Sequence, residues 1–232
     1  MKLHIVLAMS FLAHAACAQR MQYPAIKRTA QQLINFVPPG WEIRDGTTGD
    51  LNKDGLADKA LVLERSAGKG ATNAQDLTAS TVPRMLVVLF KLPGNQGYAL
   101  GAQSNSFILL HDDPEADDPF ASISIARGVL KIDFQYNRPD SHDDISTSAY
   151  KFRYDGQHFV LIGADLSITG RMSFTFQAYS YNFLTRKGVF TTGALGEVAD
   201  KTLTKTLKLP LPRTLDTFAQ PGTWVLNENF AL

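Results

Sequence analysis

The sequence predicts a mainly β (α+β) protein: an antiparallel β-meander or sandwich-like sheet domain with one N-terminal helix. Three observations lead to this fold class. Apolar residues recur with a period of two along most of the chain, several of these runs are joined by glycine-containing turns, and one early stretch alone has helical apolar spacing. No internal repeat is visible, so a repeat architecture is not expected.

The helix is expected at about 24–37. Pro24 suits a first helical position, and the sequence PPG at 38–40 would end the helix. The apolar residues that would share one face are Ile26, Ala30, Leu33, Ile34 and Val37. Their three- and four-residue spacing predicts that this face packs on the sheet.

Strands are expected from Trp41 onward. Continuous apolar runs of strand length occupy 84–92 and 106–111, and alternating runs occupy 121–127, 129–136, 149–154, 158–164 and 173–185. The dipeptides Arg127-Gly128, Asp155-Gly156 and Lys187-Gly188 are expected to be hairpin turns, because glycine supplies the positive φ that tight turns require. The chain therefore reads as a meander.

Two stretches interrupt this pattern. Residues 66–83 are small and polar and too numerous for an ordinary connection, so a mobile loop is expected there. Residues 111–119 are acidic with two prolines and are expected to form an exposed turn. The tail from Leu203 has no strong period before 223–227, which predicts an irregular course.

The first residues predict export. Residues 1–18 combine Lys2, an apolar segment and small residues before a possible cleavage point after Ala18, which is the layout of a secretory signal peptide. A periplasmic or secreted location is expected. Cys17 leaves open a second interpretation, a lipidated cysteine, although His14 stands where lipoprotein signals usually carry an aliphatic residue. No other cysteine is present, so the rest of the chain forms no internal disulfide.

Residues 19–232 are expected to form a single β-rich domain, long enough to bury a sizeable core. Without Lys2, the remaining chain carries 22 basic and 22 acidic residues. This balance gives no electrostatic reason to expect nucleic acid as a partner. No later apolar run approaches the length of a transmembrane helix, so a soluble protein is expected.

One short segment predicts a calcium site. In GDLNKDGLAD at 49–58, oxygen-bearing side chains stand at alternate positions, and Gly55 permits the sharp turn that lets them converge. The predicted ligands are the side chains of Asp50, Asn52, Asp54 and Asp58 and the backbone carbonyl of Leu56. Hard oxygen donors at this spacing suit Ca²⁺, and three carboxylates this close would repel one another without a cation. The alternative is a turn that binds nothing, because Asp, Asn and Gly favour turns in any case.

The pattern D-x-N-x-D-G-x-x-D resembles the calcium loops of FG-GAP (integrin α-type) and dockerin-like repeats. Position twelve, where an EF-hand would place glutamate, is Leu61, so the shorter loop fits better. FG-GAP propellers repeat the loop, whereas this chain has one copy; the resemblance therefore implies ion binding alone. The ion is expected to pin the start of the strand at 59–64 to residues 41–43.

A broader resemblance covers most of the exported part of the chain. The segments that carry it begin VPPGWEIRDGTTGDLNKDGLADKALVL and continue with GNQGYALGAQSNSFIL, DDPFASISIARGVLKIDFQY, KFRYDGQHFVLIGA and SYNFLT. This order is similar to that of a group of secreted bacterial β-rich proteins without an assigned activity. The resemblance implies export and a compact β-rich fold, and it implies no reaction.

Other candidate chemistry has weaker support. The acidic residues of 111–119 lack the alternate spacing of a calcium loop, and a metal site joining His111 to His142 would need distant loops to meet. The sequence contains no nucleophile elbow, no H-E-x-x-H and no phosphate-binding glycine loop, so the catalytic residues are unknown. Paired carboxylates for glycoside cleavage leave no local signature and stay possible.

Three functions remain. The preferred one is an exported, non-enzymatic protein with a structural calcium loop that binds a protein or cell-envelope partner. The second is a periplasmic inhibitor or immunity-type protein, and the third is a carbohydrate- or peptidoglycan-acting hydrolase. The third predicts a cleft with two carboxylates.

Overall fold

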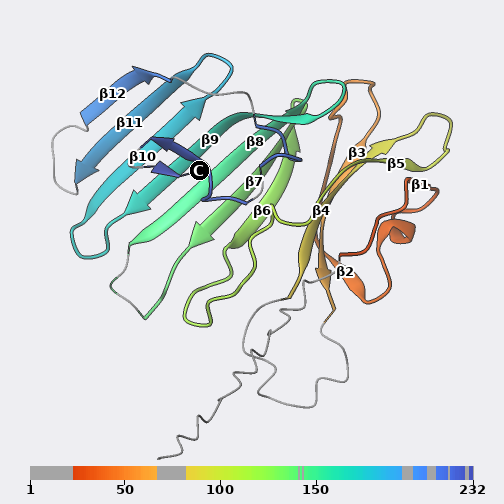
Figure 1. Cartoon of the computed structure of the whole chain (residues 1–232), viewed down its shortest axis with the longest axis horizontal. Coiled ribbons are helices and arrows are strands. Elements are labelled where there is room, and N and C mark those ends of the chain that lie inside the picture. The colour runs from red at the N-terminus through yellow and green to blue at the C-terminus, as the bar shows by residue number, and fades with distance from the viewer. Residues whose placement is uncertain are drawn as a thin grey trace, which may run out of the picture.

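The computed structural model confirms the mainly β class (Figure 1). It describes residues 23–66, 82–140, 142, 144–194, 201–207, 213–218, 220–227 and 230–231. The predicted signal segment 1–18 and residues 67–81 of the predicted mobile loop lie outside the described residues. Within them, two larger antiparallel sheets and one short strand pair are present.

The first sheet has five strands in the order β1-β5-β4-β3-β2. Its strands are β1 (Thr29–Ala30), β2 (Trp41–Gly49), β3 (Asp58–Arg65), β4 (Arg84–Lys91) and β5 (Tyr98–Ser104). The central strands β3 and β4 are buried on both faces, which explains why 84–92 reads as a continuous apolar run.

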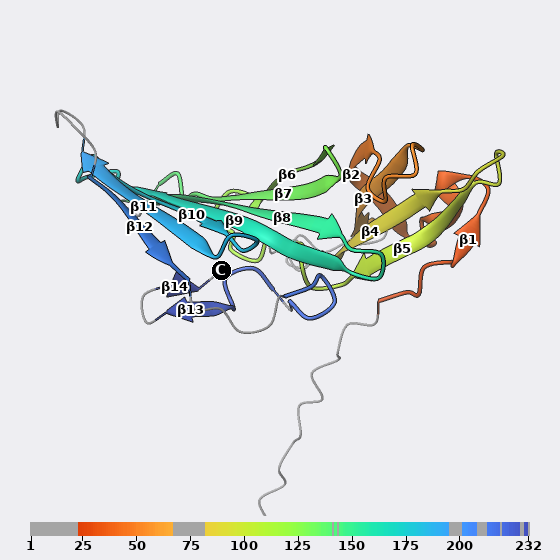
Figure 2. The same ribbon diagram turned by 90° about the horizontal axis from the view of Figure 1, so that it is seen from above.

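The second sheet has seven strands in simple sequence order from β6 to β12, which is the expected meander. Its strands are β6 (Phe120–Ala126), β7 (Val129–Tyr136), β8 (Ile145–Tyr154), β9 (Phe159–Thr169), β10 (Thr175–Asn182), β11 (Lys187–Ala194) and β12 (Lys201–Thr206). The pair β13 (Val225–Asn227) and β14 (Phe230–Ala231) lies over one face of this sheet (Figure 2).

The main core lies between the two sheets and under the C-terminal segment. Val62, Leu86 and Val88 from the first sheet join Phe134, Tyr150 and Phe152 from the second in one buried cluster. Leu215, Phe218 and Trp224 complete it from the C-terminal segment. A second cluster lies on the opposite face of the first sheet, where Ile26 and Phe36 cover β3 and β4.

The two sheets meet where β2 runs beside β6 (Figure 1). A Cβ added to Gly49 would lie 2.4 Å from Cγ2 of Ile125, so only glycine allows this approach. The backbone N–H of Ile123 also donates to Oδ2 of Asp45 at 3.3 Å. Both contacts join strands from different sheets.

The predicted N-terminal helix at about 24–37 is wrong. The segment instead forms the two-residue strand β1 and a 3₁₀ turn, η1 (Leu33–Phe36). The edge of β5 supplies hydrogen bonds that an isolated short helix cannot match: Leu100 N donates to the Arg28 carbonyl at 2.8 Å, and Ile26 N donates to Gln103. Ile34, assigned to the buried face, is exposed.

Several smaller expectations are also corrected. Residues 106–111 form no strand; Phe107 and Ile108 are buried in a connection between the sheets, so burial alone accounts for their apolar run. Lys187 and Gly188 lie inside β11, after a turn at 183–186. The tail contains a regular strand, β12. Its sequence has no apolar period that would predict a strand, because all its residues are exposed. No described helix is long and apolar enough to cross a membrane.

Candidate functional site

The segment predicted to bind calcium is the connection between β2 and β3. Gly49 pairs with Asp58 at the base of this hairpin, so the loop closes on itself. The expectation that the start of the following strand is pinned to 41–43 is wrong, because Trp41 pairs with Arg65 at the far end of the same hairpin. Gly55 has φ +83°, which agrees with the expected sharp turn.

Every predicted side-chain ligand takes part in ordering the loop backbone. Asp50 accepts hydrogen bonds from the N–H groups of Lys53 (2.6 Å) and Gly55 (3.0 Å). Asn52 Oδ1 accepts from Asp54 N, and Asp54 Oδ1 accepts from Leu56 N at 2.7 Å. Asn52 Nδ2 also donates to Asp54 Oδ2 at 2.9 Å. The oxygen-bearing side chains are therefore held within one small loop.

Asp58 differs from the others because its side chain is completely buried, with 0 % exposure. Its Oδ2 accepts from Leu51 N and its Oδ1 from Lys91 N, both at 2.8 Å. One carboxylate therefore ties the calcium-type loop to the end of β4. Burial raises the pKa of Asp58, and the nearby Asp54 charge adds to this, while the backbone hydrogen bonds oppose it.

The loop carries three aspartates and one lysine, Lys53. Among the described residues, no lysine, arginine or histidine forms an ion pair with Asp50, Asp54 or Asp58. In the same described ranges, no three Asp, Glu, His or Cys side chains are grouped so that they alone could hold a metal ion. The carboxylates face backbone amides, so an ion would also need the oxygens of Asn52 and Leu56.

The loop lies at the junction of the two sheets. Leu51 is buried in the main core. Gly128, in the tight turn between β6 and β7, has its Cβ position 3.7 Å from the Asp50 carbonyl oxygen and 3.8 Å from Cε of Lys53. The order of this loop is therefore linked to the packing of the second sheet on the first.

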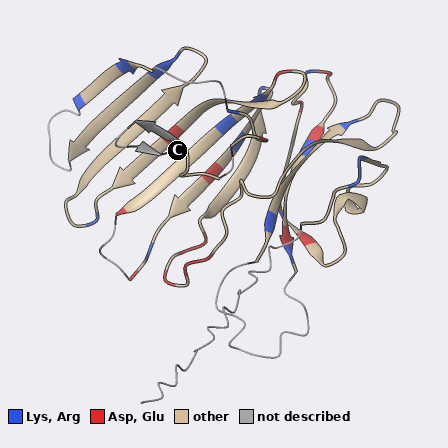
Figure 3. Ribbon diagram, in the orientation of Figure 1, with Lys and Arg blue, Asp and Glu red and all other residues tan. Residues whose placement is uncertain are grey.

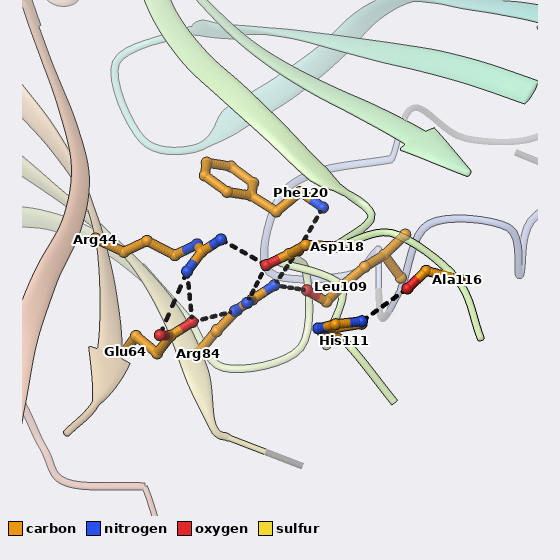
Figure 4. Close-up of polar contacts among 8 residues, drawn as sticks. All are labelled: Arg44, Glu64, Arg84, Leu109, His111, Ala116, Asp118 and Phe120. Atoms are coloured by element: carbon orange, nitrogen blue, oxygen red, sulfur yellow. Dashed lines mark hydrogen bonds and ion pairs between the residues drawn. The ribbon is translucent and has the colours of Figure 1, made fainter. Parts of the chain in front are cut away.

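A second charged site lies at the opposite end of β3 (Figure 4). Arg84, only 4 % exposed, donates through Nε to Glu64 at 2.6 Å and through Nη2 to Asp118 at 2.6 Å. Arg44 reaches the same two carboxylates. Arg84 Nη1 also donates to the Leu109 carbonyl at 2.9 Å. Two arginines and two carboxylates thus form one network that bridges the first sheet and the loop before β6.

The pKa values reflect this pairing. Burial alone would raise the pKa of Asp118, but the hydrogen bonds from Arg84 and from Phe120 N outweigh it, so the pKa is lowered. For Arg84, burial would lower the pKa, and the bonds to Asp118 and Glu64 raise it overall. The segment 111–119, expected to be a solvated acidic turn, therefore contributes one structural carboxylate. The sequence holds one sign of this network: Arg84 stands at the start of the apolar run 84–92. A charged side chain buried with such a run requires polar partners.

The metal site joining His111 to His142, for which the sequence offers only weak support, is not formed by the described residues. His111 Nε2 lies 2.8 Å from the Ala116 carbonyl, within its own loop (Figure 4). His142 is exposed, and Asp143 lies outside the described residues. Nothing in the described ranges brings these histidines into one metal-binding group.

The open face of the seven-stranded sheet carries a shallow, mainly apolar groove of about 380 Å³. Small side chains such as Ala149, Ser167 and Ala178 line it, together with Asp133 and Asp165. Both aspartates are in register with Ala149, which places their Cα atoms roughly 10 Å apart, two strand spacings. Each is paired with a lysine: Lys131 contacts Asp133 at 2.7 Å, and Lys151 contacts Asp165 at 2.5 Å.

Comparison of the chain with family models, with curated proteins and with solved structures gives no match. The resemblances stated from the sequence therefore stay predictions, and any proposal depends on the chain's own chemistry.

Proposed function

We propose that this chain is an exported, non-enzymatic, partner-binding protein whose β2–β3 loop takes a structural calcium ion. The ligands would be Asp50, Asn52, Asp54, the Leu56 carbonyl and Asp58. The observation that carries the proposal is Asp58: a buried carboxylate, near enough to Asp54 to feel its charge, with no cationic side chain paired to either among the described residues. A bound cation would offset the cost of burying and crowding these charges.

The location of the loop supports a structural role for the ion. Gly49 and Gly128 bring the loop and its stem against the second sheet, and Leu51 is part of the shared core. An ion that orders residues 50–58 would therefore stabilise the contact between the sheets. Because calcium is abundant outside the cytoplasm, even a weak site in an exported protein would be occupied.

Calcium-dependent stability tests this proposal. Chelator-treated protein should release or absorb heat on calcium titration, and its melting temperature should rise. The stabilisation should reach about 2.7 kcal/mol at a hundredfold excess over the dissociation constant, if the ion binds only the folded form. Asp54→Ala should abolish the rise, because Asp54 occupies the centre of the ligand pattern.

Asp117→Asn is the matched control. Asp117 is an exposed aspartate of the other acidic loop and accepts a hydrogen bond from Asn137, so its loss should leave the calcium response intact. Equal loss of the response in both variants would move the site to 111–119. An unchanged response in Asp54→Ala would rule out the assigned ligands.

The groove with Asp133 and Asp165 favours a hydrolase as the second candidate. Both aspartates face the same groove from strands on either side of β8, and a glycosidase needs two carboxylates that face one substrate. Each of these carboxylates already contacts a lysine, however, so neither is free to act on a substrate without first leaving that partner. Release of reducing ends from peptidoglycan, lost in Asp165→Asn, would establish this activity; equal rates in both proteins would exclude these residues.

A further inference from the structure

The hairpin between β9 and β10, residues 170–174, exposes two large apolar side chains. Met172 is 68 % exposed and Phe174 is 64 % exposed. The other described apolar side chains with similar exposure, Ile34 and Leu184, lie singly on separate turns. Two large apolar side chains are therefore exposed within one five-residue loop.

This loop is held in place despite its exposure. Gly170 N donates to the Thr175 carbonyl at 2.8 Å, and Phe174 N donates to the Gly170 carbonyl at 3.1 Å. Arg171 donates to the side chain of Asn137 and, at 3.2 Å, to the Pro139 carbonyl, which fastens the loop to its neighbour. A loop ordered before binding loses less conformational entropy when a partner binds.

The backbone of Phe174 gives an independent argument. Its φ is +53°, the left-handed region, which costs a residue with a Cβ about 1–2 kcal/mol. Glycine would remove this cost and also the exposed apolar surface. Phenylalanine thus strains the backbone and leaves 64 % of its own surface exposed, which indicates a role for its ring outside folding.

The charge of the neighbouring loops restricts the partner. Three loops lie at one end of the sheet because the strands are antiparallel: the loop before β6, the loop between β7 and β8, and the loop between β9 and β10. Figure 3 shows acidic residues along the loop before β6. Exposed acidic side chains of the first two loops are Asp112, Glu115, Asp117, Asp140 and Asp144. Arg138 and Arg171 also lie at this end, but Arg138 is paired with Asp113, and the acidic side chains remain in excess. An anionic lipid surface would be repelled by this rim, whereas a basic protein surface would be attracted.

We propose that Met172 and Phe174 are the anchors of a protein-binding surface, and that the partner is a protein with an apolar pocket surrounded by basic side chains. This inference deepens the proposed partner-binding function and rests on it. The two side chains would enter the pocket, and the acidic rim would meet the basic surround. Buried aromatic anchors with a polar rim are the usual arrangement of binding energy in such interfaces.

Site-specific photocrosslinking identifies the partner. A benzophenone amino acid at position 172, in protein added to an envelope extract of the source cells, should give one crosslinked protein of basic isoelectric point. The same probe at position 184 is the control, because Leu184 is 60 % exposed on the hairpin at the opposite end of the sheet. Equal products from both positions, or none from position 172, would overturn the proposal.

The partner identified by crosslinking is then purified on its own, and its affinity for the wild-type chain and for variants tests the two anchors. Phe174→Gly should weaken its affinity at least tenfold while leaving the melting temperature equal or higher, since glycine relaxes the backbone. Leu184→Ser should bind as the wild type does, and added salt should weaken binding. An unchanged affinity of Phe174→Gly would contradict the proposal. Two other results would contradict a basic protein partner: self-association of the chain through this loop, and binding to phosphatidylglycerol vesicles that requires Phe174. These measurements use no calcium-site variant, so a failed calcium test leaves them interpretable.

Discussion

The two ends of strand β3 handle charge in opposite ways. At its start, Asp58 is buried at the base of the loop that carries Asp50 and Asp54, and no cationic side chain of the described residues forms an ion pair with any of the three. At its end, Glu64 and Asp118 are matched by Arg44 and Arg84. One end therefore pairs its carboxylates with arginines of the chain, and the other end is where we propose that a cation binds.

The two ends are therefore expected to stabilise the fold in different ways, one through contacts within the chain and the other through a bound ion. The arginine network is complete as it stands, because the buried guanidinium of Arg84 has partners through Nε, Nη1 and Nη2. The loop at 50–58 uses its carboxylates to order backbone amides, and none of them forms an ion pair with a described residue. We therefore expect variants at the two ends to respond differently to calcium and to pH.

The largest effect is expected from Arg84→Met. Removing the guanidinium leaves Glu64 and Asp118 without their buried partner, and breaking a buried ion pair in this way costs about 3–5 kcal/mol. Urea unfolding should show this loss, with or without calcium. Arg44→Met is the control: Arg44 is far more exposed, so it should lose less than about 1 kcal/mol. Equal losses would mean that burial of Arg84 is not what makes the network stabilising.

A smaller loss is expected from Asp58→Asn, about 1–3 kcal/mol. The amide keeps the shape of the carboxylate but presents only one acceptor, so either Leu51 N or Lys91 N loses its buried partner. Urea unfolding in chelator measures this loss. In calcium the loss should increase, since the variant also lacks a ligand; a loss that is identical in calcium and chelator would exclude Asp58 from the ion site.

The sequence predicted the meander well because its strands carry local signals. The Arg127-Gly128 turn, with φ of +52° and +72°, joins β6 and β7 as expected. The calcium-type loop was equally local, so its place between two strands could be predicted. The N-terminal segment was misjudged because its structure depends on β5, about seventy residues away: a Cβ on Gly97 would lie 2.2 Å from the Ala30 carbonyl.

The arginine network could not be predicted, because its four members come from three strands and a distant loop. Glu64 and Arg84 are cross-strand neighbours in the β3–β4 pairing, yet the long connection between them hides this register in the sequence. The exposed hairpin at 170–174 was missed for another reason. Its apolar residues continue an alternating run, and only the structure shows where the strand begins.

The smallest effects, and the sharpest contrast between the two ends of β3, are expected from pH. The lowered pKa of Asp118 gives stability that is present above its unfolded-state pKa, about 3.9, and is lost as pH falls through the folded-state value. The advantage of wild type over Asp118→Asn should therefore shrink below about pH 4. The raised pKa of Asp58 acts with the opposite sign: the folded state holds the proton more tightly, so in chelator wild type should gain on Asp58→Asn as pH falls toward 3.9 from above. Urea midpoints measured between pH 7 and pH 3 would show both trends. If the two differences changed in the same direction, the two ends of β3 would not differ electrostatically as their contacts indicate.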